Sequence, residues 1–134
     1  MPARHWLWLV PVGLFGAAGI WALRTFDPNV AGNPFLPCVF HSLTGLYCPG
    51  CGATRALHAL VHFDLLRALS MNALLIVGAP IGGLLALRAL HKLPAWTDAW
   101  LRPIANPWLW AGLVTLFGVL RNLPWLPFSW LAPG

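Results

Sequence analysis

Long apolar segments constrain the fold of this chain more than any other feature of its sequence. Residues Trp6–Leu23 form an uncharged run of 18 residues between Arg4 and Arg24. A helix of this length reaches about 27 Å, close to the roughly 30 Å thickness of a bilayer's hydrocarbon core. Two further apolar segments follow, at residues 70–90 and 107–121. The sequence therefore predicts an all-α membrane protein with about three transmembrane helices.

The composition supports a membrane location and argues against a nucleic-acid binder. Only 8% of the residues are charged and 59% are hydrophobic, whereas a soluble domain carries about 25% charged residues. The nine tryptophans suit the interfacial belts of a membrane protein. The net charge of +5 comes from basic residues scattered at the ends of the apolar runs, not clustered on one face. We expect them to contact anionic lipid headgroups, with no nucleic-acid partner.

Two topological questions stay open from the sequence. Arg4 and the small residues Ala17-Ala18-Gly19 also fit a cleaved signal peptide, but Pro11 and the tryptophans near both ends of the first run favour a span. Three crossings divide the basic residues evenly between the two sides. The compact basic group in 88–102 favours an N-terminus inside, which places the following loop outside.

The segments between the spans carry signals of their own. Prolines, glycines and asparagines interrupt residues 25–51, which we expect to form a loop. Residues 52–69 form an amphipathic helix with too many polar groups for the bilayer centre, so an interfacial or re-entrant helix is predicted. Residues 91–106 are a short connector and residues 122–134 an interfacial tail. We predict that residues 1–134 form a single membrane domain. Arg121 ends the last span and is expected to snorkel to the interface.

The loop carries the most distinctive chemistry of the chain, a group of cysteines. Cys38-x2-His41 and Cys48-x2-Cys51 are two chelating pairs with six residues between them. Together they offer the three sulfurs and one nitrogen of a tetrahedral structural zinc site, although six residues is shorter than the twelve or more that usually separate such pairs. The sequence therefore suggests zinc as a cofactor.

Two other roles for the same cysteines remain open. A Cys-x-x-Cys hairpin at a helix N-terminus lowers the pKa of one thiol, so Cys48 could act as a redox nucleophile with Cys51 as its resolving partner. No βαβ pattern surrounds the hairpin, so a thioredoxin fold is not predicted. A permanent structural disulfide, Cys48–Cys51 or Cys38–Cys48, is the third possibility.

The helix after the hairpin presents a polar stripe. Cys51, Arg55, His58 and His62 recur at i, i+4, i+7 and i+11, and Thr54 lies beside them. These residues could form a polar pocket in which Arg55 receives an anionic group such as a lipid headgroup, because its guanidinium binds phosphate in a bidentate way. The alternative is that they form only the wet face of an interfacial helix.

Taken together, these motifs resemble the DUF2752 family of small bacterial membrane proteins. The resemblance rests on the Cys-Pro-x-Cys-Gly-x-x-Arg core at residues 48–55, the upstream Cys38, and the downstream Asp64 and Asn72. It extends over roughly residues 35–125. The family carries a glycine before its aspartate, where this chain has Phe63, so a tight turn is in question there.

The resemblance implies a bacterial cytoplasmic membrane location and the importance of Cys38, Cys48, Cys51 and Arg55, and it supplies no reaction. We also expect structural roles for Gly52, Asp64 and Asn72. With only three acidic residues, the chain lacks paired carboxylates for hydrolysis. We therefore expect a non-enzymatic accessory or structural protein, with an unknown protein partner, whose cysteine cluster holds a metal or a disulfide that fixes the loop. The alternative is a membrane thiol–disulfide oxidoreductase that uses Cys48 and Cys51.

Overall fold

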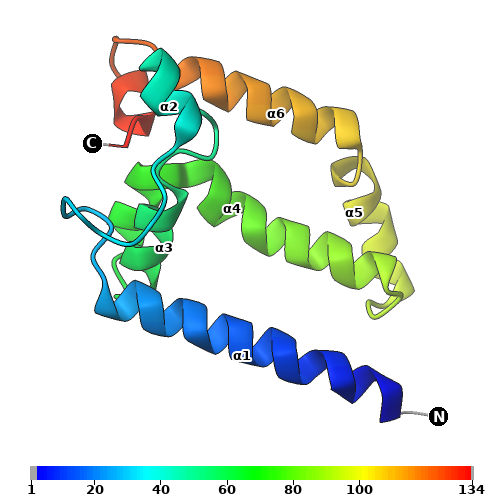
Figure 1. Ribbon diagram of the computed structural model, residues 1–134. Helices are drawn as coiled ribbons and strands as arrows, with labels where there is room; N and C mark the ends of the chain where they lie inside the picture. The colour runs from blue at the N-terminus through cyan, green and yellow to red at the C-terminus, as the bar shows by residue number, and fades with distance from the viewer. Residues whose placement is uncertain (1–2, 134) are drawn as a thin grey trace.

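The computed structural model describes residues 3–133, and these residues form helices and loops with no strand. The longer helices run across the molecule, while the shorter ones gather at their ends (Figure 1). The elements in chain order are α1 (Ala3–Thr25), α2 (Val39–Thr44), α3 (Ala53–Val61), α4 (Leu65–Ala89), the 3-10 turn η1 (Ala95–Thr97), α5 (Asp98–Ile104), α6 (Pro107–Leu120) and the 3-10 turn η2 (Phe128–Leu131). Helices α2 and α3 lie at one end of α4, together with the C-terminus, and α5 lies at the other end.

Two helices are long and apolar enough to cross a membrane. They are Leu7–Thr25, with 19 residues, and Leu65–Ala89, with 25 residues. The predicted third span at 107–121 is too short by itself, because the 14 residues of α6 reach only about 21 Å. It is long enough to cross a membrane only together with Ala95–Ile104, and the two helices are bent by 47° relative to each other. The described residues thus contain two candidate spans, or three if this bent pair is one span.

The predicted continuous helix over residues 52–69 is wrong, because a tight turn separates α3 from α4. Phe63 lies in the left-handed region with φ 62°, and Asp64 then caps α4 by accepting a hydrogen bond from the backbone amide of Arg67 at 3.0 Å. An aspartate at this position satisfies a free amide of the first turn. The turn forms with phenylalanine where the family carries glycine.

A second break lies inside α4, at Asn72. Its backbone is not helical, with φ −158° and ψ 87°, and its Oδ1 accepts a hydrogen bond from the amide of Leu75 at 3.0 Å. Asn72 therefore caps the long apolar part of α4.

The loop over residues 25–51 contains the short helix α2, which the sequence analysis missed. The segment lies between Pro37 and Gly45, and it ends where Gly45 takes the left-handed conformation with φ 73°. Its amide then bonds to the carbonyl of His41 at 2.8 Å, as is usual at a helix C-terminus. Proline before and glycine after a six-residue segment are helix-boundary signals, but they are also ordinary loop residues.

The core of the described region is small and lies around the cysteine hairpin. Its buried apolar residues are Cys51, Ala56, Ala59 and Ala68. Alanine at these positions lets α3 and α4 approach closely. Most large apolar side chains of the long helices are exposed, as expected for helices whose surroundings are lipid. The buried apolar residues therefore gather at one end of α4.

We predict that Phe63→Gly does not destabilise the protein and raises its stability by up to about 1 kcal/mol. The left-handed conformation costs a residue with a Cβ roughly 1–2 kcal/mol, and glycine avoids that cost while losing about 0.5–1 kcal/mol in backbone entropy. Phe63 is 87% exposed, so little packing is lost. Thermal unfolding in detergent measures the change. Leu66→Gly is the matched control, because Leu66 is 82% exposed within regular helix and should lose about 1 kcal/mol. Equal losses in both variants would contradict the account of the turn.

Candidate metal centre

Three cysteine sulfurs converge at the hairpin. The Sγ of Cys48 lies 2.9 Å from that of Cys51 and 3.3 Å from that of Cys38, and all three sulfurs lie within 4.8 Å of one another. All three are free thiols, because a disulfide bond requires about 2.05 Å. Cys51 is 6% exposed, and Cys38 and Cys48 are half-buried. These residues form a group that could hold a metal ion.

The hairpin holds its two cysteines together through local backbone contacts. The amide of Cys51 bonds to the carbonyl of Cys48 at 3.0 Å, and the amide of Cys48 donates to the Sγ of Cys51 at 3.1 Å. Gly52 follows with φ 79°, and a Cβ there would lie 2.6 Å from the carbonyl oxygen of Met71. Only glycine satisfies both conditions, which gives the predicted structural role of Gly52 a physical reason.

Cys38 reaches the hairpin from the N-terminus of α2. The backbone amide of His41 lowers the pKa of the Cys38 thiol to about 7, with further help from Cys51 and Cys48. Burial has the opposite effect on Cys51 and, with the neighbouring Cys48 thiol, raises its pKa to about 12. One sulfur of the group is therefore easily ionised, whereas the buried one needs a nearby cation to become a thiolate.

Arg121 provides a positive charge beside this group, and the sequence analysis did not predict it. The side chain is 1% exposed, so it does not snorkel to the surface as expected from its place at the end of an apolar run. Its Nη1 donates to the carbonyls of Cys48 at 2.8 Å and Pro49 at 3.3 Å, and its Nη2 donates to the carbonyl of Met71 at 3.3 Å. The guanidinium also lies 4.9 Å from the centre of the Phe117 ring.

Two asparagines also hydrogen-bond to the hairpin and to Tyr47 just before it. Asn72, which is 2% exposed, donates from Nδ2 to the carbonyls of Pro49 at 3.0 Å and Cys51 at 3.2 Å. Asn122 donates to the carbonyl of Tyr47 at 2.8 Å and accepts from the amide of Tyr47 at 2.7 Å. We call Asn72, Arg121 and Asn122 the hairpin clamp. No local sequence pattern marks Arg121 or Asn122. Their partners Cys48, Pro49 and Tyr47 lie more than 70 residues away along the chain.

His41 does not join the sulfurs, so the predicted set of four ligands is not assembled. Among the residues whose side chains the structure describes, the group within 4.8 Å contains only the three cysteines. The Nδ1 of His41 lies 3.2 Å from the carbonyl oxygen of Leu46, and its ring stacks on Tyr47 with 4.6 Å between ring centres. The exposed imidazole therefore contacts Leu46 and Tyr47 and does not act with Cys38 as a metal ligand, as their spacing had suggested.

The polar stripe of α3 makes contacts with the end of α1. The Nδ1 of His58 donates to the carbonyl oxygen of Leu23 at 2.6 Å, and the rings of His58 and His62 lie 4.4 Å apart. Thr54 and Arg55 are half-buried on the same helix. Neither histidine belongs to the sulfur group. An anion pocket around Arg55 stays a prediction.

The fold and this site define a small helical protein with membrane-length helices and a three-cysteine group. The family model described as "Protein of unknown function (DUF2752)" matches residues 38–86, which include all three cysteines, α3 and most of α4. This match confirms the resemblance seen in the sequence. No curated protein and no solved structure matches the chain.

We predict that Arg121→Met lowers the free energy of unfolding by about 3 kcal/mol. The substitution keeps an apolar stem and removes the charged donor of three hydrogen bonds, to the carbonyls of Cys48, Pro49 and Met71. The carbonyls of Cys48 and Pro49 each keep a second donor, the amide of Cys51 and the side chain of Asn72, and a hydrogen bond to a charged group contributes roughly 1.5–3 kcal/mol. Thermal unfolding in detergent provides the measurement. Arg67→Met is the control at an exposed arginine. Similar small effects of the two substitutions would mean that Arg121 is an interfacial arginine after all.

Proposed function

We propose that this protein is a non-enzymatic accessory or structural membrane protein whose Cys38, Cys48 and Cys51 bind one zinc ion. The ion would join the N-terminus of α2 to the hairpin and so fix the loop at the membrane interface. The observation that carries the proposal is the convergence of the three sulfurs within 4.8 Å. The same sulfurs come from two segments of the loop, the N-terminus of α2 and the hairpin.

The spacing of the sulfurs suits a zinc ion after small side-chain rotations. Thiolates bound to tetrahedral zinc at about 2.3 Å lie roughly 3.8 Å from one another. The two shorter sulfur distances, 2.9 Å and 3.3 Å, are each within about 1 Å of that value. Rotation about the χ1 angles of Cys38 and Cys48, which are half-buried, is sufficient to open the group.

The charge around the group also favours a metal. Three thiolates and one Zn²⁺ leave one unit of net negative charge, and Arg121 supplies the matching positive charge through its electrostatic attraction to Cys48 and Cys51. In residues 7–133 no carboxylate forms an ion pair with Arg121. A buried cation without an anion is costly, so a thiolate centre gives this arginine a partner.

A disulfide would fix the loop less completely than a metal. A Cys48–Cys51 bond would leave the Cys38 thiol beside it unused and would present a neutral group to Arg121. With zinc, all three sulfurs are used, and a water molecule or a side chain of a partner protein would complete the tetrahedron. The alternative function as a thiol–disulfide oxidoreductase is not proposed, because no observation on the described residues favours it.

The location of the protein forms the second part of the proposal. Helices α1 and α4 would cross the membrane, and the bent pair α5 and α6 would form a third crossing. The cysteine loop would then lie at one membrane surface, with Arg55 close to anionic headgroups. The family resemblance supports a bacterial cytoplasmic membrane.

We predict about one zinc ion per chain in protein purified in detergent without chelator or reductant, measured by mass spectrometry of the elements. Serine at Cys38, Cys48 or Cys51 removes a ligand and should reduce the zinc content to background, while His41→Ala should retain it. Wild-type protein free of any metal at the same purity would contradict the proposal, as would serine variants that keep their zinc.

Two controls separate the metal from a disulfide and from general unfolding. A strong chelator should lower the melting temperature of the wild type and leave that of the Cys48→Ser variant unchanged, because that variant has no metal to lose. Mass spectrometry after alkylation of the denatured, unreduced protein should find three modified cysteines. A Cys48–Cys51 cross-linked peptide would identify the disulfide instead.

A further inference from the structure

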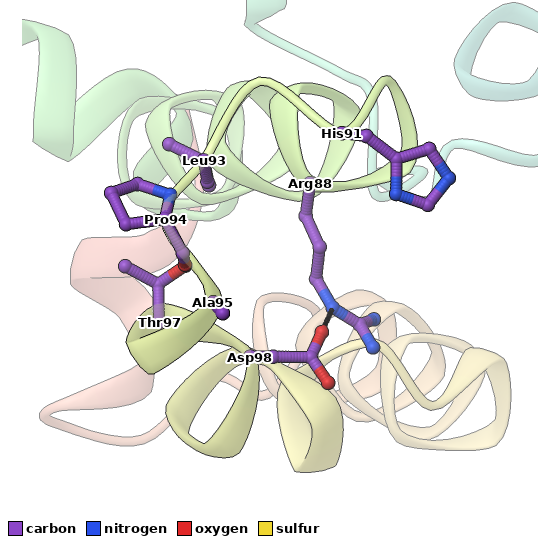
Figure 2. A pocket seen from close by; sticks show the side chains of 7 residues that line it. All are labelled: Arg88, His91, Leu93, Pro94, Ala95, Thr97 and Asp98. Carbon is purple, nitrogen blue, oxygen red and sulfur yellow. Dashed lines mark hydrogen bonds and ion pairs between the residues drawn. The ribbon is translucent and has the colours of Figure 1, made fainter.

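A cavity of about 380 Å³ lies at the opposite end of α4 from the sulfur group. Its walls come from the last turn of α4, the turn that follows, η1 and the start of α5. The polar side chains that line it are Arg88, His91, Thr97 and Asp98 (Figure 2). Its volume lies in the range of pockets that bind small molecules, about 300–1,000 Å³.

The polar groups of this cavity leave an arginine ready to bind an anion. The Nε of Arg88 donates to the Oδ1 of Asp98 at 2.6 Å, and Figure 2 shows the two terminal nitrogens of the guanidinium facing away from that carboxylate. The second oxygen of Asp98 accepts a hydrogen bond from Arg102 at 3.1 Å. Asp98 thus has both oxygens engaged and orients Arg88, whose terminal nitrogens have the paired geometry that binds phosphate.

Basic residues and exposed tryptophans surround the cavity. Within residues 88–102 the three basic side chains outnumber the single carboxylate, that of Asp98. His91 also lines the cavity and adds positive charge when it is protonated. Trp96 and Trp100 are exposed close by in the sequence, and exposed tryptophans favour the level of the lipid headgroups. The cavity lies at the end of a helix long enough to cross a membrane, so we expect it at the level of the lipid headgroups.

We propose that this cavity binds the phosphate group of an anionic phospholipid, with Arg88 as its principal contact. Asp98 acts as a positioning residue, because it holds Arg88 through Nε and leaves the terminal nitrogens for the phosphate. The site is independent of the cysteine centre, since no residue is shared between them. Soluble phosphates offer the same chemistry, so the experiment compares the two sources.

The test is a binding titration of the full-length protein in detergent with short-chain phosphatidylglycerol, phosphatidylcholine and inorganic phosphate, followed by native mass spectrometry. Phosphatidylglycerol should bind more tightly than either of the others. Arg88→Gln should weaken its binding about tenfold, as expected for the loss of a charge-assisted bidentate contact. Arg67→Gln, at an exposed arginine outside the cavity, should bind like the wild type.

A second variant separates binding from a purely structural ion pair. Asp98→Asn removes the negative charge but keeps a side-chain oxygen that can accept from the Nε of Arg88, so Arg88 stays oriented and phosphatidylglycerol should bind at least as tightly as to the wild type. If the Arg88–Asp98 pair only stabilises the turn, Asp98→Asn should weaken binding as Arg88→Gln does, and that result would overturn the proposal. Binding that is equal in Arg88→Gln and wild type would also overturn it. Inorganic phosphate that binds as tightly as phosphatidylglycerol would overturn the assignment to a lipid. If Arg88→Gln does not fold, the Asp98→Asn result decides.

Discussion

The structure depends on the hydrogen bonds that the backbone carbonyls of the Cys48–Cys51 hairpin accept from Asn72 and Arg121. These are the two most buried polar side chains of the described region. A buried carbonyl without a donor costs roughly 1–3 kcal/mol. Asn72 and Arg121 meet this requirement from the kink of α4 and the end of α6, two places far apart in the chain. The hairpin, the start of the long apolar part of α4 and the end of α6 are therefore held by one set of contacts.

The same contacts set the chemistry of the cysteines. Arg121 must approach the hairpin to donate to its carbonyls, and this places a buried positive charge beside Cys48 and Cys51. That positive charge matches the net negative charge of a zinc ion bound by three thiolates. The hairpin clamp fixes the backbone of the hairpin, and the position of the cysteine sulfurs depends on that backbone.

The sequence predicted what local patterns control and missed what distant contacts control. The length of the apolar runs predicted helices that are long enough to cross a membrane, and the cysteine spacing predicted that the three sulfurs lie together. The turn at Phe63, where φ is 62°, was missed although Asp64 is a usual helix cap, because this position lacks the glycine that we expected for a tight turn. Arg121 ends an apolar run and so suggested snorkelling. Only its contacts with residues 50 or more positions away give it a buried role.

X-ray absorption at the zinc edge tests the central claim most directly, since it reports the atoms bound to the metal in the intact protein. The account predicts three sulfur neighbours at about 2.3 Å from zinc, with one nitrogen or oxygen at about 2.0–2.1 Å as the fourth ligand. Cys38→Ser should remove the zinc or replace one sulfur by oxygen. A spectrum with no sulfur neighbours, or with only two that are unaffected by Cys38→Ser, would contradict a centre built from Cys38, Cys48 and Cys51.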